Sequence, residues 1–145
     1  VFQVPVLDFP ETIPPGRMED YDPLRAYLAD TGTLRWSYGA VKGRPEADWQ
    51  ARVRDDVGLL GALPGLLGLG FEGLWVDTWG YGDGSADGAQ VARLPAELGV
   101  SPLRSPDGRF LFFDLRPYRE RLGRTDAQLR GDAERLLGVT PPVGG

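Results

Sequence analysis

The segment Phe71–Asp77, with the sequence FEGLWVD, limits the possible folds more than any other part of the chain. Leu74, Trp75 and Val76 are apolar without alternation, so a strand here presents apolar side chains on both faces. Strands of this kind are typical of sheets that helices cover on both sides. The length of 145 residues suits one such core. The segment therefore predicts an α/β fold with this strand at the centre of the sheet.

Strands and helices are expected to alternate before this segment. Asp22 followed by Pro23 predicts a helix N-cap and first helical residue. Gly61 and Pro64 are expected to break a later helical pattern and leave a short separate helix. The elements predicted here are a strand over 1–7, a helix over 22–32, a strand over 33–38, a helix over 45–60 and a short helix over 63–70.

After the segment, the pattern changes to a hairpin and helices. Apolar residues at helical spacing predict a helix that is interrupted near Pro95 and closes at Gly99. The sequence SPDG at 105–108 predicts a type I turn between Leu103 and a strand over 110–115. A helix is expected from Pro117, and the capping box at 125–128 predicts the start of a last helix.

This order of elements predicts an open three-layer α/β/α sandwich, with a mostly parallel sheet and an antiparallel C-terminal hairpin. We expect a single α/β domain over 1–138 and a flexible C-terminal tail over 139–145. The opening VFQVPV and the closing TPPVGG are typical of a domain cut from a longer protein.

The composition excludes several classes of function. The chain has no cysteine and no histidine, which excludes thiol nucleophiles, Ser-His-Asp triads and zinc sites built on thiolate or imidazole. The net charge of -5 argues against a nucleic-acid partner, because affinity for the phosphate backbone needs clustered cations. Asp77, Asp83 and Asp87 lack the ligand spacing of an EF-hand loop. We therefore expect no metal and no cofactor.

Three segments that follow the first three predicted strands are candidate sites, because ligands gather at the carboxyl ends of parallel strands. They are 8–11, 37–44 and 77–83. In the second segment and just before it, Arg35, Lys42 and Arg44 suit a phosphate or carboxylate ligand. The alternative is that these cations form ion pairs with nearby carboxylates. Trp36 and Tyr38 are expected to lie in the core.

Asp77 ends the central strand, where a catalytic carboxylate would stand, with Trp79 and Tyr81 able to stack on a sugar ring. The alternative is that Asp77 caps the following turn. A glycosidase would need two carboxyl groups about 5 to 9.5 Å apart. The candidates for such a pair are Asp8, Glu11, Asp77 and Asp83.

Four segments, VFQVPVLDFPE, LRWSYGAVKGR, GFEGLWVDTWGYGDG and SPDGRFLFFDLRPY, together resemble a soluble domain of large bacterial polytopic membrane proteins. Those proteins are described as sugar translocases, phosphoglycerol-transferase-like proteins or glycosyltransferase-like proteins. The resemblance implies a position outside the cytoplasm, attached to a transmembrane part of the same polypeptide and facing lipid-linked sugars or envelope glycans. It assigns no catalytic residue, and its matching positions define a candidate ligand-binding surface of Gln3, Glu11, Arg35, Tyr38, Lys42, Arg44, Asp77 and Tyr81.

The leading hypothesis is a non-catalytic extracytoplasmic accessory domain that recognises or positions a glycan or lipid-phosphate substrate for the membrane protein. The first alternative is a carbohydrate-active enzyme that uses a carboxylate pair. The second is a structural domain that packs on its parent or on a partner.

Overall fold

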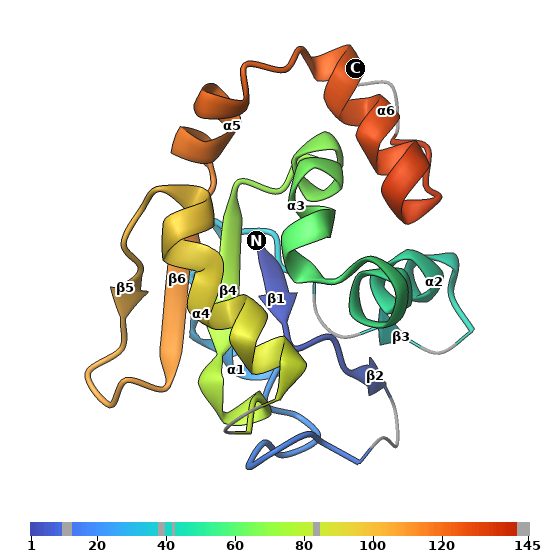
Figure 1. Cartoon of the computed structure of the whole chain (residues 1–145). Coiled ribbons are helices and arrows are strands. Elements are labelled where there is room, and N and C mark those ends of the chain that lie inside the picture. Colours follow the sequence, from blue (N-terminus) through green and yellow to red (C-terminus); the bar gives the residue numbers. More distant parts are fainter. Residues whose placement is uncertain (10–12, 38–39, 42, 83–84, 142–145) are drawn as a thin grey trace.

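A computed structural model of the chain describes residues 1–9, 13–37, 40–41, 43–82 and 85–141. The fold is mixed α/β and contains a four-stranded sheet (Figure 1). In spatial order, its strands are β1 (Phe2–Val4), β4 (Gly73–Asp77), β6 (Phe110–Asp114) and β5 (Leu103–Arg104). The interior place of β4, between β1 and β6, confirms the prediction made from its unbroken apolar sequence.

The prediction of a mostly parallel sheet is wrong. Only β1 and β4 run parallel in the four-stranded sheet, whereas β4 pairs with β6 and β6 with β5 in antiparallel fashion. The hairpin formed by β5 and β6 was predicted, and its turn is closed by a hydrogen bond from the Gly108 N–H to the Ser105 carbonyl. The hairpin places β6 directly beside β4, so the sheet is mixed at its centre and not only at its edge.

The predicted strand over 33–38 does not form in the described residues 33–37. Leu34 is exposed there, and the Trp36 indole donates to Asp30 at 3.2 Å. A second, two-stranded parallel sheet forms nearby from β2 (Asp8–Phe9) and β3 (Ala40–Val41). The strand predicted over 1–7 forms only over 2–4. It ends before Pro5, because proline has no N–H to donate to a neighbouring strand.

The helices follow the sequence signals at most of their ends. The helix α4 (Ala86–Leu98) closes at Gly99 in the left-handed conformation, as predicted, and α6 (Asp126–Leu137) begins with the predicted capping box. The predicted interruption near Pro95 is wrong, because Pro95 lies inside α4. Two shorter helices are α1 (Leu24–Ala29) and α5 (Arg116–Leu122).

The predicted break at Gly61 and Pro64 is wrong. Both residues lie inside α3 (Leu59–Gly68). The helix α2 (Pro45–Arg52) runs on through a π-helical turn and stops at Gly58, whose φ of 75° is readily adopted only by glycine. The break therefore comes three residues earlier than predicted, at the position where the backbone needs a glycine.

The core lies on the face of the sheet that packs against α3 and α4, with α5 and α6 beyond one end of the sheet (Figure 1). Side chains from β1, β4 and β6 alternate into it, among them Phe2, Leu74, Val76 and Phe113. The short helix α1 lies behind the sheet, and the aromatic residues on that second face remain half-buried. A three-layer sandwich is thus not confirmed. Within the described residues, no helix is both long and apolar enough to cross a bilayer.

Candidate functional site

The carboxyl end of β4 carries a buried ion pair. Asp77 is the last residue of β4, and Arg109 immediately precedes β6. Antiparallel pairing of these strands sets Asp77 opposite Phe110, which brings the two charged side chains together. Arg109 Nη2 lies 2.6 Å from Asp77 Oδ2, and Arg109 Nε lies 2.9 Å from Asp77 Oδ1. Both side chains are about 5% exposed, so this is a fork-to-fork contact shielded from water.

A second carboxylate, from Asp22, joins this pair. Arg109 Nη2 donates to Asp22 Oδ2 at 2.7 Å, and the Glu19 N–H donates to the same oxygen at 2.8 Å. Burial alone would raise the pKa of Asp22, but these hydrogen bonds and the positive charges of Arg109 and Arg25 outweigh burial and lower it. Asp22 does not cap α1 as predicted, because the N-cap is Pro23 and makes no side-chain hydrogen bond. Its carboxylate points instead to the end of β4.

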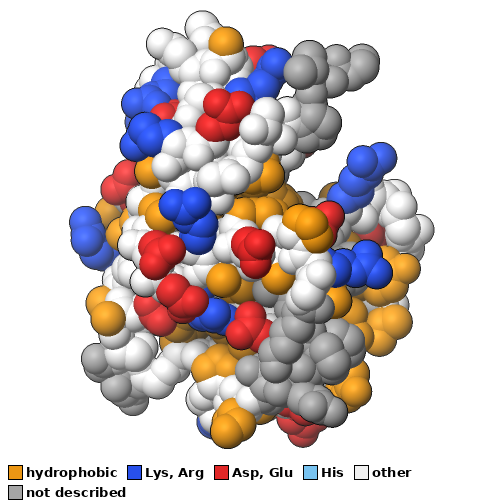
Figure 2. Space-filling view, turned by 90° about the vertical axis from the view of Figure 1, so that its right-hand side faces the viewer, with side chains coloured by type: hydrophobic (Ala, Val, Ile, Leu, Met, Phe, Trp, Pro, Cys, Tyr) orange, Lys and Arg blue, Asp and Glu red, His pale blue; other side chains and the backbone are white. Residues whose placement is uncertain are grey.

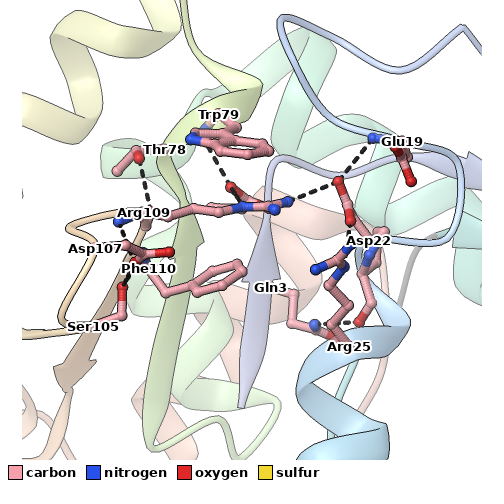
Figure 3. A network of polar contacts seen from close by, with 12 residues as sticks. Gln3, Glu19, Asp22, Arg25, Thr78, Trp79, Ser105, Asp107, Arg109 and Phe110 are labelled. Carbon is pink, nitrogen blue, oxygen red and sulfur yellow. Dashed lines mark hydrogen bonds and ion pairs between the residues drawn. The ribbon is translucent and has the colours of Figure 1, made fainter.

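Aromatic rings cover both sides of the Arg109 guanidinium, as Figure 3 shows. Its central carbon lies 3.9 Å from the Trp79 ring centre and 4.7 Å from that of Phe110. Arg17 lies 4.7 Å from the Trp79 ring centre as well. Such cation–π contacts strengthen when they are shielded from water. The cluster of Asp22, Asp77, Trp79, Arg109 and Phe110, here called the Arg109 cluster, is therefore a packed unit that ties the loop before α1 to the sheet.

The contacts of Asp77 within the Arg109 cluster differ from those expected of a glycosidase acid. Asp77 uses both oxygens to accept hydrogen bonds from Arg109, and Oδ1 also accepts the Trp79 N–H at 3.1 Å. A glycosidase acid must hold a proton at neutral pH, usually in a pocket without a paired cation. The geometry matches the capping role considered for Asp77, now joined by an ion pair.

A separate cavity of about 310 Å³ opens beside α2. Gln50 lies in its wall and is only 4% exposed, and its Oε1 atom has no hydrogen-bond partner within the described part of the chain. Asp8, at the same cavity, forms an ion pair of 3.2 Å with Arg54. The described lining residues combine apolar and polar side chains: Leu7, Asp8, Asp20, Pro23, Leu24, Ser37, Val41, Arg44, Glu46 and Gln50. This hollow is called the Gln50 cavity below.

The candidate residues that the structure describes do not share one hollow. Arg44 lines the Gln50 cavity, whereas Arg35 borders a different hollow beside Glu72 and Asp114. Tyr81 borders a third, at the start of α4, and burial, with help from Asp87 and Asp77, raises the pKa of its phenol. Four predicted positions lie outside the described residues: Glu11, Tyr38, Lys42 and Asp83.

Gln3, another candidate that the structure describes, is buried and forms a hydrogen bond within the fold. Its Nε2 atom donates to the Pro23 carbonyl at 2.8 Å, which attaches β1 to the start of α1. Among the described candidates, only Arg44 thus reaches the Gln50 cavity, together with Asp8 from the proposed carboxylate pair.

Sequence reasoning missed Arg109 and Gln50. Arg109 directly follows the SPDG turn, and a correct pairing of the two apolar strands would have set it beside Asp77. Gln50 gave a weaker signal, a single polar residue next to Trp49 and three before Val53 on a helical pattern. Its burial depends on how α2 packs, which the local sequence does not show.

No family model matches this sequence, and searches of curated proteins and of solved structures find no match. Among the described residues, no group of three or more acidic, histidine or cysteine side chains is placed to hold a metal ion.

Proposed function

We propose that this chain is a non-catalytic accessory domain, outside the cytoplasm and part of a larger bacterial membrane protein, that recognises or positions a glycan or lipid-phosphate substrate. The observation that carries the proposal is the Gln50 cavity with its unpaired amide oxygen. The sequence resemblance supports the membrane setting, in which the transmembrane part of the same polypeptide is the partner.

The cavity has the properties of a small-ligand site. Its volume of about 310 Å³ is at the lower end of the usual range, and a few polar groups stand among apolar walls. A buried acceptor without a donor costs about 1–3 kcal/mol. A bound molecule that donates to Gln50 Oε1 would remove this cost, which is a physical reason for such a group to lie in a binding site.

The surroundings of the carboxylates favour binding over catalysis. Asp77 is enclosed in the Arg109 cluster, and Asp8 is paired with Arg54. An acid and base pair needs one carboxyl group that keeps its proton and one that is ionised. Asp77 and Asp8 are instead each held in an ion pair with an arginine.

Titration of the chain with two sets of probes tests the proposal. Neutral cell-envelope oligosaccharides form one set and soluble polyprenyl-phosphate head-group analogues the other, and amide chemical shifts are followed by NMR. We expect a probe from at least one set to move the amides of Leu24, Val41 and Gln50. Val41→Trp, at the cavity, should weaken the effect, whereas Arg35→Ala, in a separate hollow, should not. Unchanged spectra with every probe would contradict the proposal.

An interaction domain is a second candidate, favoured by an apolar groove on the second face of the sheet. Trp36, Trp75 and Phe112 line this groove together with Leu103, which is 73% exposed. In that case the groove would pack against the rest of the parent polypeptide. The same titration separates the candidates, because a domain used only for packing binds neither set of probes at the Gln50 cavity.

A further inference from the structure

The geometry points to a single sugar ring without an acidic group as the ligand of the Gln50 cavity, an inference that rests on the proposed function and narrows its substrate class. Three properties of the cavity carry the inference: its size, its charge and the chemistry of its buried amide.

The size and the walls suit one ring. A volume of about 310 Å³ is at the lower limit for cavities that enclose small ligands, so a single ring fits better than an extended chain. Leu7, Leu24 and Val41 provide apolar walls. A pyranose has C–H groups on its ring faces that can lie against such walls, while its hydroxyl groups point outward to polar partners.

The charge of the cavity opposes an anion. Its described lining residues include the acidic Asp8, Asp20 and Glu46 and one cation, Arg44. Asp8 already forms an ion pair with Arg54. Asp20 and Glu46 therefore provide two negative charges against the single positive charge of Arg44. Among the described lining residues, negative charge exceeds positive charge and Arg44 offers one guanidinium, so they would repel a phosphate or uronate group. Figure 2 shows the face of the molecule that lies at the right in Figure 1. Acidic and basic side chains are interspersed on this face.

The buried amide requires a hydrogen-bond donor. Gln50 Oε1 is an acceptor without a partner, and the broad terminal torsion of glutamine allows the oxygen to turn toward the cavity. A sugar hydroxyl or amine donates to such an oxygen. The phosphate group of a monoester dianion, as in a lipid-phosphate head group, has acceptor oxygens only and leaves the amide oxygen unpaired. The amide therefore distinguishes the two substrate classes of the proposed function.

The experiment compares five probes by NMR titration of the same chain: glucose, glucosamine, glucose 1-phosphate, glucuronate and inorganic phosphate. We expect glucose or glucosamine to shift the amides around Gln50 at concentrations where the three anions do not. Gln50→Leu, close in size, should lower the affinity for the bound sugar about tenfold, as expected for one lost hydrogen bond to a buried group. Arg35→Ala is the control variant and should bind the sugar as the unchanged chain does.

The thermal stability of Gln50→Leu keeps a folding defect apart from a binding defect. Replacing an unpaired buried amide by an apolar group of similar shape is neutral or stabilising, so the variant without ligand should melt at the same or a higher temperature. Tighter binding of the phosphate or the uronate than of glucose would overturn the inference and leave the proposed function standing. Sugar binding that Gln50→Leu does not weaken would overturn it as well. Failure of all five probes and of the larger envelope probes would overturn both.

Discussion

At the scale of single residues, the Arg109 cluster holds a buried cation by contacts on every side. Arg109 has two carboxylate partners in the interior and a ring on either side. Hydrogen bonds with Asp77 raise the pKa of its guanidinium further, so the charge is permanent. Because desolvated charges are costly, the cluster is stable only as a complete set. Removal of its cation should therefore cost far more than removal of an exposed charge.

We predict that Arg109→Met lowers the free energy of unfolding by about 3–5 kcal/mol, because it leaves two buried carboxylates without their common cation. Arg25→Ala is the matched control. It removes a 2.7 Å contact with Asp22 from a side chain that is 58% exposed, and should cost about 0–1 kcal/mol. Urea unfolding followed by tryptophan fluorescence measures both. Equal losses in the two variants would show that the cluster is not a buried unit.

The same residues show how far a sequence can locate a site. Asp77 was identified as a residue of interest because it ends an apolar strand, which is a local pattern. Asp22 was assigned a local role as an N-cap, but besides its local contacts it pairs with Arg109, 87 residues away. A short-range signal such as Asp-Pro gives no information on a contact of that kind. The chemical role of a charged residue therefore stayed open until its partner was placed.

At the scale of elements, the packing of α6 on α3 depends on a glycine. A Cβ added to Gly68, the last residue of α3, would lie 2.0 Å from the Leu129 carbonyl oxygen of α6. Backbone atoms cannot yield as a flexible side chain can. The two helices are therefore in close contact at this position only because Gly68 has no side chain.

We predict that Gly68→Ala lowers the free energy of unfolding by about 1–3 kcal/mol, the usual cost of overpacking, because α6 must move away from α3. Gly131→Ala in α6 is the matched control. A Cβ there meets nothing within 4 Å, so the better helix propensity of alanine should stabilise the protein by about 0.5–1 kcal/mol. Thermal unfolding followed by circular dichroism shows whether each variant is less or more stable than the unchanged chain. A Gly68→Ala variant that is more stable would contradict the close contact.

Elements were predictable where their signals are local. The capping box at Thr125, the glycine stop at Gly99 and the turn at 105–108 were all read from a few neighbouring residues. The strand expected at 33–38 failed in its described part, because alternation of apolar and polar residues there reflects an aromatic contact: Trp36 packs edge-on against Trp75 with ring centres 5.6 Å apart. Periodicity identified which side chains pack, but not whether the backbone joins a sheet.

At the scale of the whole molecule, strand direction and cavities depend on how distant elements are arranged. An alternating order of strands and helices favours parallel pairing, but here the hairpin of β5 and β6 supplies the neighbour of β4. The Gln50 cavity likewise forms between segments from the first strands, α1 and α2. The sequence therefore predicted a mixed α/β fold and the inner strand, but neither the sheet's strand directions nor the cavity, which depend on the assembled chain.

The response to acid also belongs to the whole molecule. The chain has no histidine, so no side chain with an ordinary pKa titrates between pH 5 and 7. The buried carboxyls of Asp22 and Asp132 behave alike: burial would raise their pKa values, but hydrogen bonds, from Glu19 and Arg109 or from Arg124 and Arg135, lower them. Because their pKa values are lower in the folded than in the unfolded state, their ionised forms stabilise the fold.

We therefore predict a free energy of unfolding that stays level between pH 7 and 5 and falls below about pH 4, as the medium passes the unfolded pKa and approaches the folded values. Urea midpoints at pH 7, 5, 3 and 2 measure this. Asp132→Asn should start from a lower stability at pH 7 and lose less between pH 5 and 3, because a buried carboxylate with a lowered pKa is gone. A rise in stability as the pH falls from 7 to 5 would point to a carboxyl group whose pKa is raised in the folded state, the property that the glycosidase hypothesis requires. A loss between pH 7 and 5 as large as that between 5 and 3 would contradict the prediction.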